Sequence, residues 1–437
     1  MADAIEQQQS AGTHVASSPG QTRRVVASSF LGSTVEFYDF LLYTSAAAVV
    51  FPSVFFSGLS PEMGIASFAT LAIGFVARPV GSMVFGSLGD RLGRKPVLVL
   101  TMVLMGLVST GIGALPSDDS IGAAAPVLLI ALRLVQGLAV GGEWGAATAL
   151  SLEHAPQRWR ATLVAVVSTG APAGSLLASA AMGTAAALTG PAFLDWGWRI
   201  PFFASAVLVL LGLYMRSRVA EAPQFERAAK SATLLRAPVR VIFTRHTAAL
   251  TRVSIAILTA FVIQGVIVSY ALNYAVADGL PRDRALFLLT LSSVVGIVVQ
   301  LGAGVAADRY GRRTLMLVGT AGTAVLAFPM FWALDTGSGW GVFWCFTLGH
   351  GITQAVLVAC VGSFVGEMFP TAVRTTASGL GYQLAGSIGG FSSVVAAALV
   401  AWTGSIYSVA LLLLVVAVAS TAAVLRSRET RGHHLPD

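Results

Sequence analysis

The chain has 437 residues, of which 55% are hydrophobic, only 11% are charged and 46 are glycine. A soluble protein carries about 25% charged residues, so this composition excludes a soluble globular enzyme, a disordered chain and a disulfide scaffold, and it requires lipid as the solvent. The formal net charge of +7 leaves a nucleic-acid binder open until the positions of the charges are considered.

The order of polar and apolar segments predicts a polar tail followed by membrane spans. Residues 1–22 are rich in Ser, Gln and Gly and lack a basic segment followed by an apolar one, so a disordered cytoplasmic tail is predicted rather than a signal peptide. Apolar stretches of the length needed to cross a bilayer, about 20 residues, then follow at 27–50, 63–87, 96–115, 124–152, 160–190, 197–217, 247–276, 285–307, 314–334, 340–366, 373–402 and 404–425. These twelve stretches lack the alternating period of barrel strands, so transmembrane helices are predicted.

The basic residues indicate the orientation in the membrane. If both termini are cytoplasmic, 21 of the 27 Lys and Arg residues fall in cytoplasmic segments and three, at 199, 282 and 284, fall in outer loops. An even number of spans agrees with this placement. The positive charge is therefore a topology signal, which excludes nucleic acid as a partner and predicts a multi-pass protein of the cytoplasmic membrane.

Two pairs of related segments indicate an internal repeat. GSLGDRLGRK begins at Gly86 after the second span, and GVAADRYGRR begins at Gly304 after the eighth, at the corresponding point of the second half. A Glu-Pro-Arg set at 153, 156 and 160 returns with the same internal spacing at 367, 370 and 374. The predicted units are a tail (1–22), an N-terminal six-helix bundle (23–217), a cytoplasmic central loop (218–246), a C-terminal six-helix bundle (247–425) and a cytoplasmic tail (426–437). Parallel halves of this kind are a transporter design, with the site between the halves near the midplane.

These motifs carry a family resemblance over the whole chain. GSLGDRLGRK and RLVQGLAVGG (133–142) resemble signatures of the major facilitator superfamily. Within it, GSTVEFYDFLLY (32–43), GFVARPVGSMVFGSLGDRLGRK (74–95), RLVQGLAVGGEWGAA (133–147) and WGWRIPFF (196–203) are similar to the metabolite:proton symporter family. The resemblance implies an all-α membrane protein with the major facilitator fold, and a carrier of shikimate, α-ketoglutarate, citrate, or proline with glycine betaine. The chain departs from that family at Ser33 and Phe37, where Asn and Trp are more usual, and neither change removes a charge.

An acid pair in the first span is the predicted proton site. Glu36 and Asp39 are three residues apart and share one helix face. Two close carboxylates in a low dielectric favour the protonated form of at least one, which can then bind and release a proton during transport. A structural ion pair with Arg133 is the alternative, and the family resemblance favours Asp39 as the proton carrier.

Three further charged residues within the spans extend this prediction. Arg133 must keep an anion partner, either as a counter-ion that is released on protonation or in a permanent salt bridge. Glu143, ten residues further along the same span, relays a proton or bonds to neighbouring helices. Arg78 precedes Pro79 and is suited to bidentate carboxylate recognition, unless it pairs with a carboxylate of the first span.

Polar and aromatic residues of several spans are predicted to line the substrate cavity. They are Tyr43, Gln136, Trp144, Gln264, Tyr270, Asn273, Tyr274, His350, Gln354, Tyr382 and Gln383. His350 either titrates or serves as a hydrogen-bonding residue of the cavity. The second half lacks acid pairs within its spans, so the proton chemistry is predicted in the first half.

The repeated loop motifs are predicted to form a gate at the cytoplasmic side. An aspartate there can satisfy a helix N-terminus of the opposite half, and the arginines can bond carboxylates or helix C-termini. The predicted gate residues are Asp90, Arg91, Arg94, Lys95, Glu153, Asp308, Arg309, Arg312, Arg313, Glu367 and Arg374. Anchoring of the loops is the alternative role.

The combined prediction is a secondary active transporter and not an enzyme. It imports a small polar metabolite with protons by alternating access, most simply an organic acid such as shikimate or a di- or tricarboxylate. The alternatives are proton-coupled efflux of drugs or metabolites, and an osmolyte or sugar carrier of the same fold. The expected partners are the metabolite, the proton and the bilayer, with no cofactor or metal and a functional monomer.

Overall fold

The computed structural model describes residues 19–56, 63–221, 225–226, 237–433 and 435–436. Twelve segments of this part of the chain are helical, long and apolar enough to span a membrane. They run over 19–49, 72–92, 94–114, 124–154, 157–193, 199–217, 247–277, 282–310, 312–335, 339–366, 374–403 and 407–425. The twelve predicted spans are therefore confirmed, with most ends within about five residues of the prediction.

The first six spans form the N-terminal bundle. Its long helices are α2 (Pro19–Val49), α4 (Met63–Leu92), α5 (Arg94–Ala114), α7 (Ala124–His154), α8 (Arg160–Ser168) with α9 (Gly170–Thr189), and α10 (Arg199–Ser217). The short helices α3 (Phe51–Phe55), η1 (Gln157–Trp159), α6 (Asp118–Ile121) and η2 (Gly190–Phe193) connect them. Because α2 begins at Pro19, the last four residues of the predicted tail are helical, while residues 1–18 lie outside the described part.

The last six spans form the C-terminal bundle. Its helices are α13 (Thr247–Ile263), η3 (Gln264–Ala271), α14 (Leu272–Ala277), α15 (Arg282–Tyr310), α16 (Arg312–Asp335), α17 (Gly339–Phe346), η4 (Thr347–Gln354), α18 (Ala355–Gly366), α19 (Arg374–Gly390), α20 (Ser392–Thr403) and α21 (Tyr407–Leu425). The segments η3 and η4 are π-helical turns within spans seven and ten. A further helix, α12 (Pro238–Arg245), forms within the predicted central loop.

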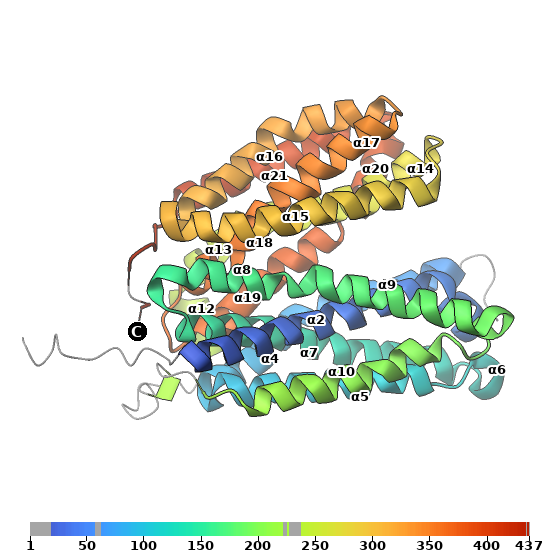
Figure 1. Cartoon of the computed structure of the whole chain (residues 1–437), viewed down its shortest axis with the longest axis horizontal. Helices are drawn as coiled ribbons and strands as arrows, with labels where there is room; N and C mark the ends of the chain where they lie inside the picture. The colour runs from blue at the N-terminus through green and yellow to red at the C-terminus, as the bar shows by residue number, and fades with distance from the viewer. Residues whose placement is uncertain (1–18, 57–62, 222–224, 227–236, 434, 437) are drawn as a thin grey trace, which may run out of the picture.

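The two bundles lie side by side and meet most closely at one end (Figure 1). The first and last described residues lie at that end, which we call the terminus face; the opposite end is the far face. There α19 of the C-terminal bundle packs on α4 and α7, and α8 of the N-terminal bundle packs on α15 and α18. Towards the far face the ribbons of the two bundles diverge (Figure 1).

Candidate transport site and gate

The acid pair of α2 is buried inside the N-terminal bundle. Glu36 is 6% exposed and Asp39 is 1% exposed. Ser205 Oγ of α10 donates a hydrogen bond to Asp39 Oδ1 at 2.6 Å, while Oδ2 is buried with no hydrogen-bond partner among the described residues. Neither carboxylate forms an ion pair with a described residue, so the predicted alternative of a structural salt bridge to Arg133 is absent from this state.

Arg133 of α7 is held by neutral groups. Its Nη1 donates to Gln136 Oε1 at 2.7 Å, and its Cζ lies 4.0 Å from the centroid of the Tyr43 ring. The guanidinium lies against Gly74 of α4, where a Cβ would stand 2.7 Å from Arg133 Nε. A larger residue at 74 would therefore displace this side chain. The Arg133 side chain is only 3% exposed. It is therefore a buried charge close to the acid pair and not a surface group.

Arg78 of α4 is half-buried and lies between aromatic rings. Its Cζ is 4.8 Å from the centroid of Phe75 and 5.2 Å from that of Phe40. It forms neither a hydrogen bond nor an ion pair with any residue that the structure describes. The predicted alternative, a pair with a carboxylate of the first span, is therefore not formed, and the guanidinium donors are free to bind a carboxylate.

Glu143 pairs with Arg216, one of the 21 basic residues that the sequence analysis counted as cytoplasmic. Arg216, near the end of α10, is 2% exposed and forms an ion pair with Glu143 of α7. Gly32 of α2 lies directly against this pair, because a Cβ there would stand 2.8 Å from Glu143 Oε1. Arg216 is thus a buried partner within the bundle and not a topology signal.

A hydrogen-bonded chain links three spans of the C-terminal bundle. Ser293 Oγ lies 3.1 Å from His350 Nε2, and His350 Nδ1 lies 2.5 Å from Gln354 Oε1. Gln354 Nε2 then donates to Ala260 O at 3.1 Å and to Gln264 Oε1. Gln264 opens η3 and Gln354 closes η4, so the two π-turns meet at this amide pair. Such turns often lie at functional sites.

The other predicted lining residues separate into two groups. Trp144 of α7 stacks on Tyr382 of α19 with ring centroids 3.7 Å apart, and Gln383 Nε2 donates to Val140 O at 3.4 Å, so these residues join the two bundles. Tyr270, Asn273 and Tyr274 do not bond to the chain around Gln354. Asn273 Nδ2 donates to Ser269 O, Tyr270 has a ring contact with Tyr274, and Tyr274 OH donates to Asp335 at the far end of α16.

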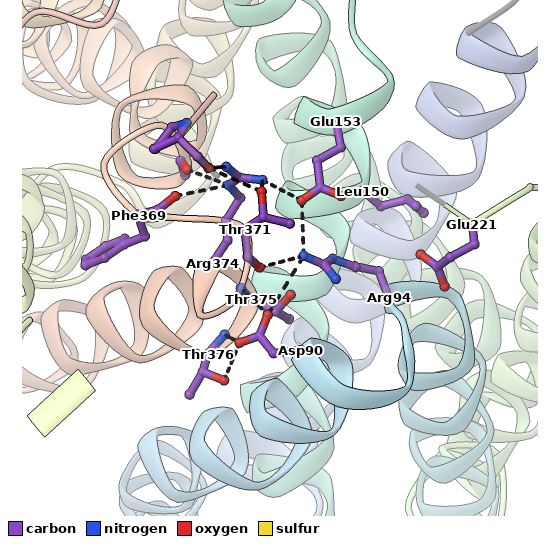
Figure 2. A network of polar contacts seen from close by, with 12 residues as sticks. Asp90, Arg94, Leu150, Glu153, Glu221, Phe369, Thr371, Arg374, Thr375 and Thr376 are labelled. Carbon is purple, nitrogen blue, oxygen red and sulfur yellow. Dashed lines mark hydrogen bonds and ion pairs between the residues drawn. The ribbon is translucent and has the colours of Figure 1, made fainter. Parts of the chain in front are cut away.

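At the terminus face, each bundle caps a helix of the other with an aspartate. Asp90 at the end of α4 accepts hydrogen bonds from the backbone N–H groups of Thr375 and Thr376, both at 2.9 Å, and from Thr376 Oγ1 at 2.7 Å (Figure 2). These donors form the N-terminus of α19, where an anion is favoured.

The repeat places a second aspartate in the corresponding position. Asp308 at the end of α15 accepts from Ala161 N at 3.0 Å, Thr162 N at 2.8 Å and Thr162 Oγ1 at 2.7 Å. Positions 161 and 162 directly follow the repeated arginine at 160, just as positions 375 and 376 follow the one at 374. The structure therefore contains the helix-terminus contact that the sequence predicted, once in each direction across the two bundles.

Arginines from both bundles converge on one glutamate in each repeat. Arg94 Nη2 and Arg374 Nη1 donate to Glu153 Oε1 at 3.1 and 2.6 Å (Figure 2). In the second repeat Arg312 and Arg160 lie 3.3 and 3.6 Å from the carboxylate of Glu367, with which Thr430 Oγ1 also forms a hydrogen bond. Burial raises the pKa of Glu367, and the nearby Arg312 opposes that shift.

The remaining predicted gate residues stay within their own bundles or face outward. Lys95 Nζ donates to Ser217 O at 3.2 Å, and Arg313 Nη2 donates to Leu425 O at 2.7 Å, each at the end of the last helix of its half. Two exposed arginines, at 91 and 309, form no hydrogen bond or ion pair across the bundles with the described residues.

Two glutamates that sequence reasoning missed belong to the same face. Glu221 accepts from Lys95 N at 3.0 Å, and Glu429 accepts from Arg312 N and Arg313 N, both at 3.1 Å. Each lies shortly after the last span of its half and caps the helix that follows the repeated motif. That shared position is the sequence signal that could have revealed them.

Comparisons with known proteins agree with this architecture. A sequence model of the Major Facilitator Superfamily matches residues 30–394, and a second match covers 279–436. The chain is 39% identical to the shikimate transporter of Escherichia coli (strain K12) over 420 residues, which cover 94% of this chain and 95% of that protein. It is 36% identical to the inner membrane metabolite transport protein YhjE of the same strain, with 94% and 95% covered.

More distant matches include carriers with other substrates in their names. The proline/betaine transporter of E. coli (strain K12) is 30% identical, with 95% of this chain and 85% of that protein covered. The solved structure of the proton:xylose symporter XylE shares the fold with a TM-score of 0.75 at 18% identity, with 95% and 98% covered. The protein is therefore a multi-pass transporter of metabolites in a cell membrane and not an enzyme: the chain belongs to the Major Facilitator Superfamily.

Proposed function

We propose that this transporter imports a small hydroxylated organic acid together with a proton. The observation that carries the proposal is an arginine without an ion pair, Arg78, close to Glu36, which with Asp39 forms a buried acid pair that also lacks an ion pair. Burial without a partner penalises the charged state of each group. A substrate carboxylate at Arg78 and a proton on one acid relieve both penalties together, which couples the two binding events.

The C-terminal bundle supplies the neutral part of this site. The Gln264, His350 and Gln354 side chains offer amide and imidazole groups that exchange hydrogen bonds with substrate hydroxyls. The 39% identity to a shikimate transporter supports a hydroxylated cyclic acid as the first cargo to test.

The terminus face is assigned to the cytoplasm because it collects most of the basic residues. The contacts of Asp90, Asp308, Glu153 and Glu367 join the two bundles there, which supports the assignment of this arrangement to a state closed to the cytoplasm. These contacts must break when the bundles rock to release the substrate inside.

The gate assignment predicts an effect of Asp90→Asn on access to the site. Asn keeps one of the two acceptor oxygens that Asp90 uses and loses the negative charge at the helix N-terminus, so the closed state should lose about 1–2 kcal/mol and open about 5- to 30-fold more often. A cysteine placed at Ser82, which is buried beside Gly379 of the other bundle, reports opening through maleimide labelling from the cytoplasmic side. Both native cysteines, 345 and 360, are fully buried and are replaced in this background.

Asp308→Asn should accelerate labelling in the same way, because the repeat gives it the same contacts. Arg91→Gln is the matched control, since Arg91 is exposed at the same helix end and forms no hydrogen bond or ion pair with a described residue of the other bundle. Equal labelling rates for Asp90→Asn and Arg91→Gln would show that the aspartate anchors its loop and does not gate.

Uptake into proteoliposomes with an alkaline interior tests the proposed function. The panel contains shikimate, α-ketoglutarate, citrate, glycine betaine and xylose, and protein-free liposomes measure passive entry. Shikimate uptake above that background, abolished by a protonophore, is expected. Betaine or xylose uptake without any acid uptake would establish an osmolyte or sugar carrier instead. Acid uptake that is unchanged by the protonophore would show that transport is not coupled to protons.

A further inference from the structure

The charges within the membrane part of the N-terminal bundle are balanced. Between the terminus face and the far face, its described residues include three acids and three arginines: Glu36, Asp39, Glu143, Arg78, Arg133 and Arg216. The C-terminal bundle adds His350 and, nearer the terminus face, the exposed Arg252. Arg252 is not part of the region around the transport site, so with the three acids ionised and the histidine neutral that region has no net charge.

Only one of these arginines is available to a ligand. Arg216 is committed to Glu143, and this pair is 3% exposed on both sides. Arg133 is 3% exposed and held by Gln136 and Tyr43. Arg78 is half-buried and has no hydrogen-bond partner among the described side chains. One guanidinium fork matches one carboxylate.

One proton cancels the negative charge that a carboxylate bound at Arg78 adds to this region. The groups around Glu36 and Asp39 are Tyr38 and Tyr43 on the same helix, together with Arg78 (α4), Ser109 (α5), Arg133 and Glu143 (α7), Arg216 and Ser205 (α10), and Tyr382 (α19). Of these, only Glu143 is a further acid, and its charge is matched by Arg216. A bound monoanion changes the net charge by one negative unit, and protonation of Glu36 or Asp39 cancels that unit.

We infer that the substrate is a carboxylate monoanion carried with one proton, so that transport is electroneutral. This inference rests on the proposed function and specifies the charge of its cargo. A di- or tricarboxylate would bring a second negative charge into this region. Its other two arginines are not available, because Arg133 is buried and Arg216 is paired with Glu143. That charge would be buried without a partner, which is strongly unfavourable. A citrate-like trianion is therefore a poor substrate, although the metabolite:proton symporter family that this chain resembles includes citrate carriers.

Steady-state accumulation of shikimate in proteoliposomes tests both the proton count and the net charge. With one proton per substrate, a pH difference of one unit should give about tenfold accumulation, because one unit of pH corresponds to a factor of ten. A potassium-valinomycin potential of about 100 mV changes accumulation about 50-fold for each charge that moves. We expect no change with that potential of either sign, and no transient current on a solid-supported membrane.

A shift of accumulation with the imposed potential, or about 100-fold accumulation per pH unit, would overturn the inference while leaving proton-coupled uptake in place. Absence of any uptake driven by the pH difference would instead overturn the proposed function. The initial rates of citrate and α-ketoglutarate uptake should be at least about tenfold lower than that of shikimate, since each leaves a buried charge unpaired. An equal initial rate of citrate uptake contradicts the inference.

Two substitutions at Arg78 separate charge from geometry. Arg78→Lys keeps the positive charge but loses the fork, so it should raise the KM for shikimate while uptake stays indifferent to the potential. Arg78→Gln leaves the region one unit negative before substrate binds, so anion uptake should be lost. Retained shikimate uptake by Arg78→Gln would show that the carboxylate binds elsewhere.

Discussion

Replacing Asp39 with Asn is expected to abolish accumulation of substrate against a gradient. If the wild-type carrier couples one proton to each substrate, as we propose, it reaches about tenfold accumulation per pH unit, and the variant should only equilibrate its substrate. Asn has the shape of a protonated Asp, and Ser205 Oγ can still donate to its side-chain oxygen as it does at 2.6 Å to Asp39 Oδ1. Exchange of external for internal substrate should therefore persist, because the variant resembles the loaded state.

The measurement compares accumulation and exchange of labelled shikimate in the same proteoliposomes. Asp335→Asn is the matched control, since Asp335 accepts hydrogen bonds from Tyr274 and Tyr407 at the far end of the C-terminal bundle and takes no part in the site. Full accumulation by Asp39→Asn would transfer the proton to Glu36, whose Gln variant then provides the next test.

The second large effect is a loss of stability when the Glu143–Arg216 pair is broken. Glu143→Gln keeps the side-chain volume but leaves the Arg216 guanidinium 2% exposed without its ion partner. Removing one partner of a buried pair costs about 3–5 kcal/mol, because the remaining charge stays desolvated. The unfolding temperature of the purified protein in detergent should fall accordingly.

The double variant Glu143→Gln, Arg216→Gln removes both charges and should recover most of that loss. A neutral amide pair needs far less solvation than a lone charge, so the double variant should be more stable than Glu143→Gln alone. If the two single effects simply add, Glu143 and Arg216 do not stabilise each other, and Glu143 is then free to act as a proton relay.

The sequence predicted the membrane spans and the contacts of the repeated motifs at the terminus face. Twelve apolar stretches of sufficient length have few stable arrangements other than membrane helices, which explains why the predicted spans match. The contacts of Asp90 and Asp308 between the bundles followed from the repeat, because a motif present once in each half predicts the same contact twice. Asp90 and Asp308 indeed cap helices of opposite bundles.

The partners of buried charges were harder to predict. Arg216 lies beside Ser217 and Arg218 at a helix end, and its position in the sequence is that of a membrane-surface arginine. Its side chain instead reaches back into the bundle to Glu143, far away in the sequence, and only the packing of α10 against α2 and α5 fixes that direction. The hydrogen-bond partner of Tyr274 could not be predicted from the sequence either. Its position in the chain is typical of a cavity-lining residue, but its hydroxyl donates a hydrogen bond to Asp335.

The two π-turns have no sequence signal that we recognised. Each adds one residue to a helical turn, which rotates the following side chains relative to a regular helix. Gln264 and Gln354 meet because η3 and η4 lie at corresponding positions of spans seven and ten. A regular helical projection of the sequence therefore places the polar faces of these spans incorrectly beyond the turns.

Recording the external pH while shikimate is added to proteoliposomes without an imposed gradient tests proton-coupled uptake most directly. If a proton enters with each substrate molecule, the weakly buffered medium becomes alkaline as labelled shikimate enters, and Asp39→Asn shows no pH change. Entry of shikimate through the wild-type protein with no alkalinisation would contradict proton coupling in this transporter.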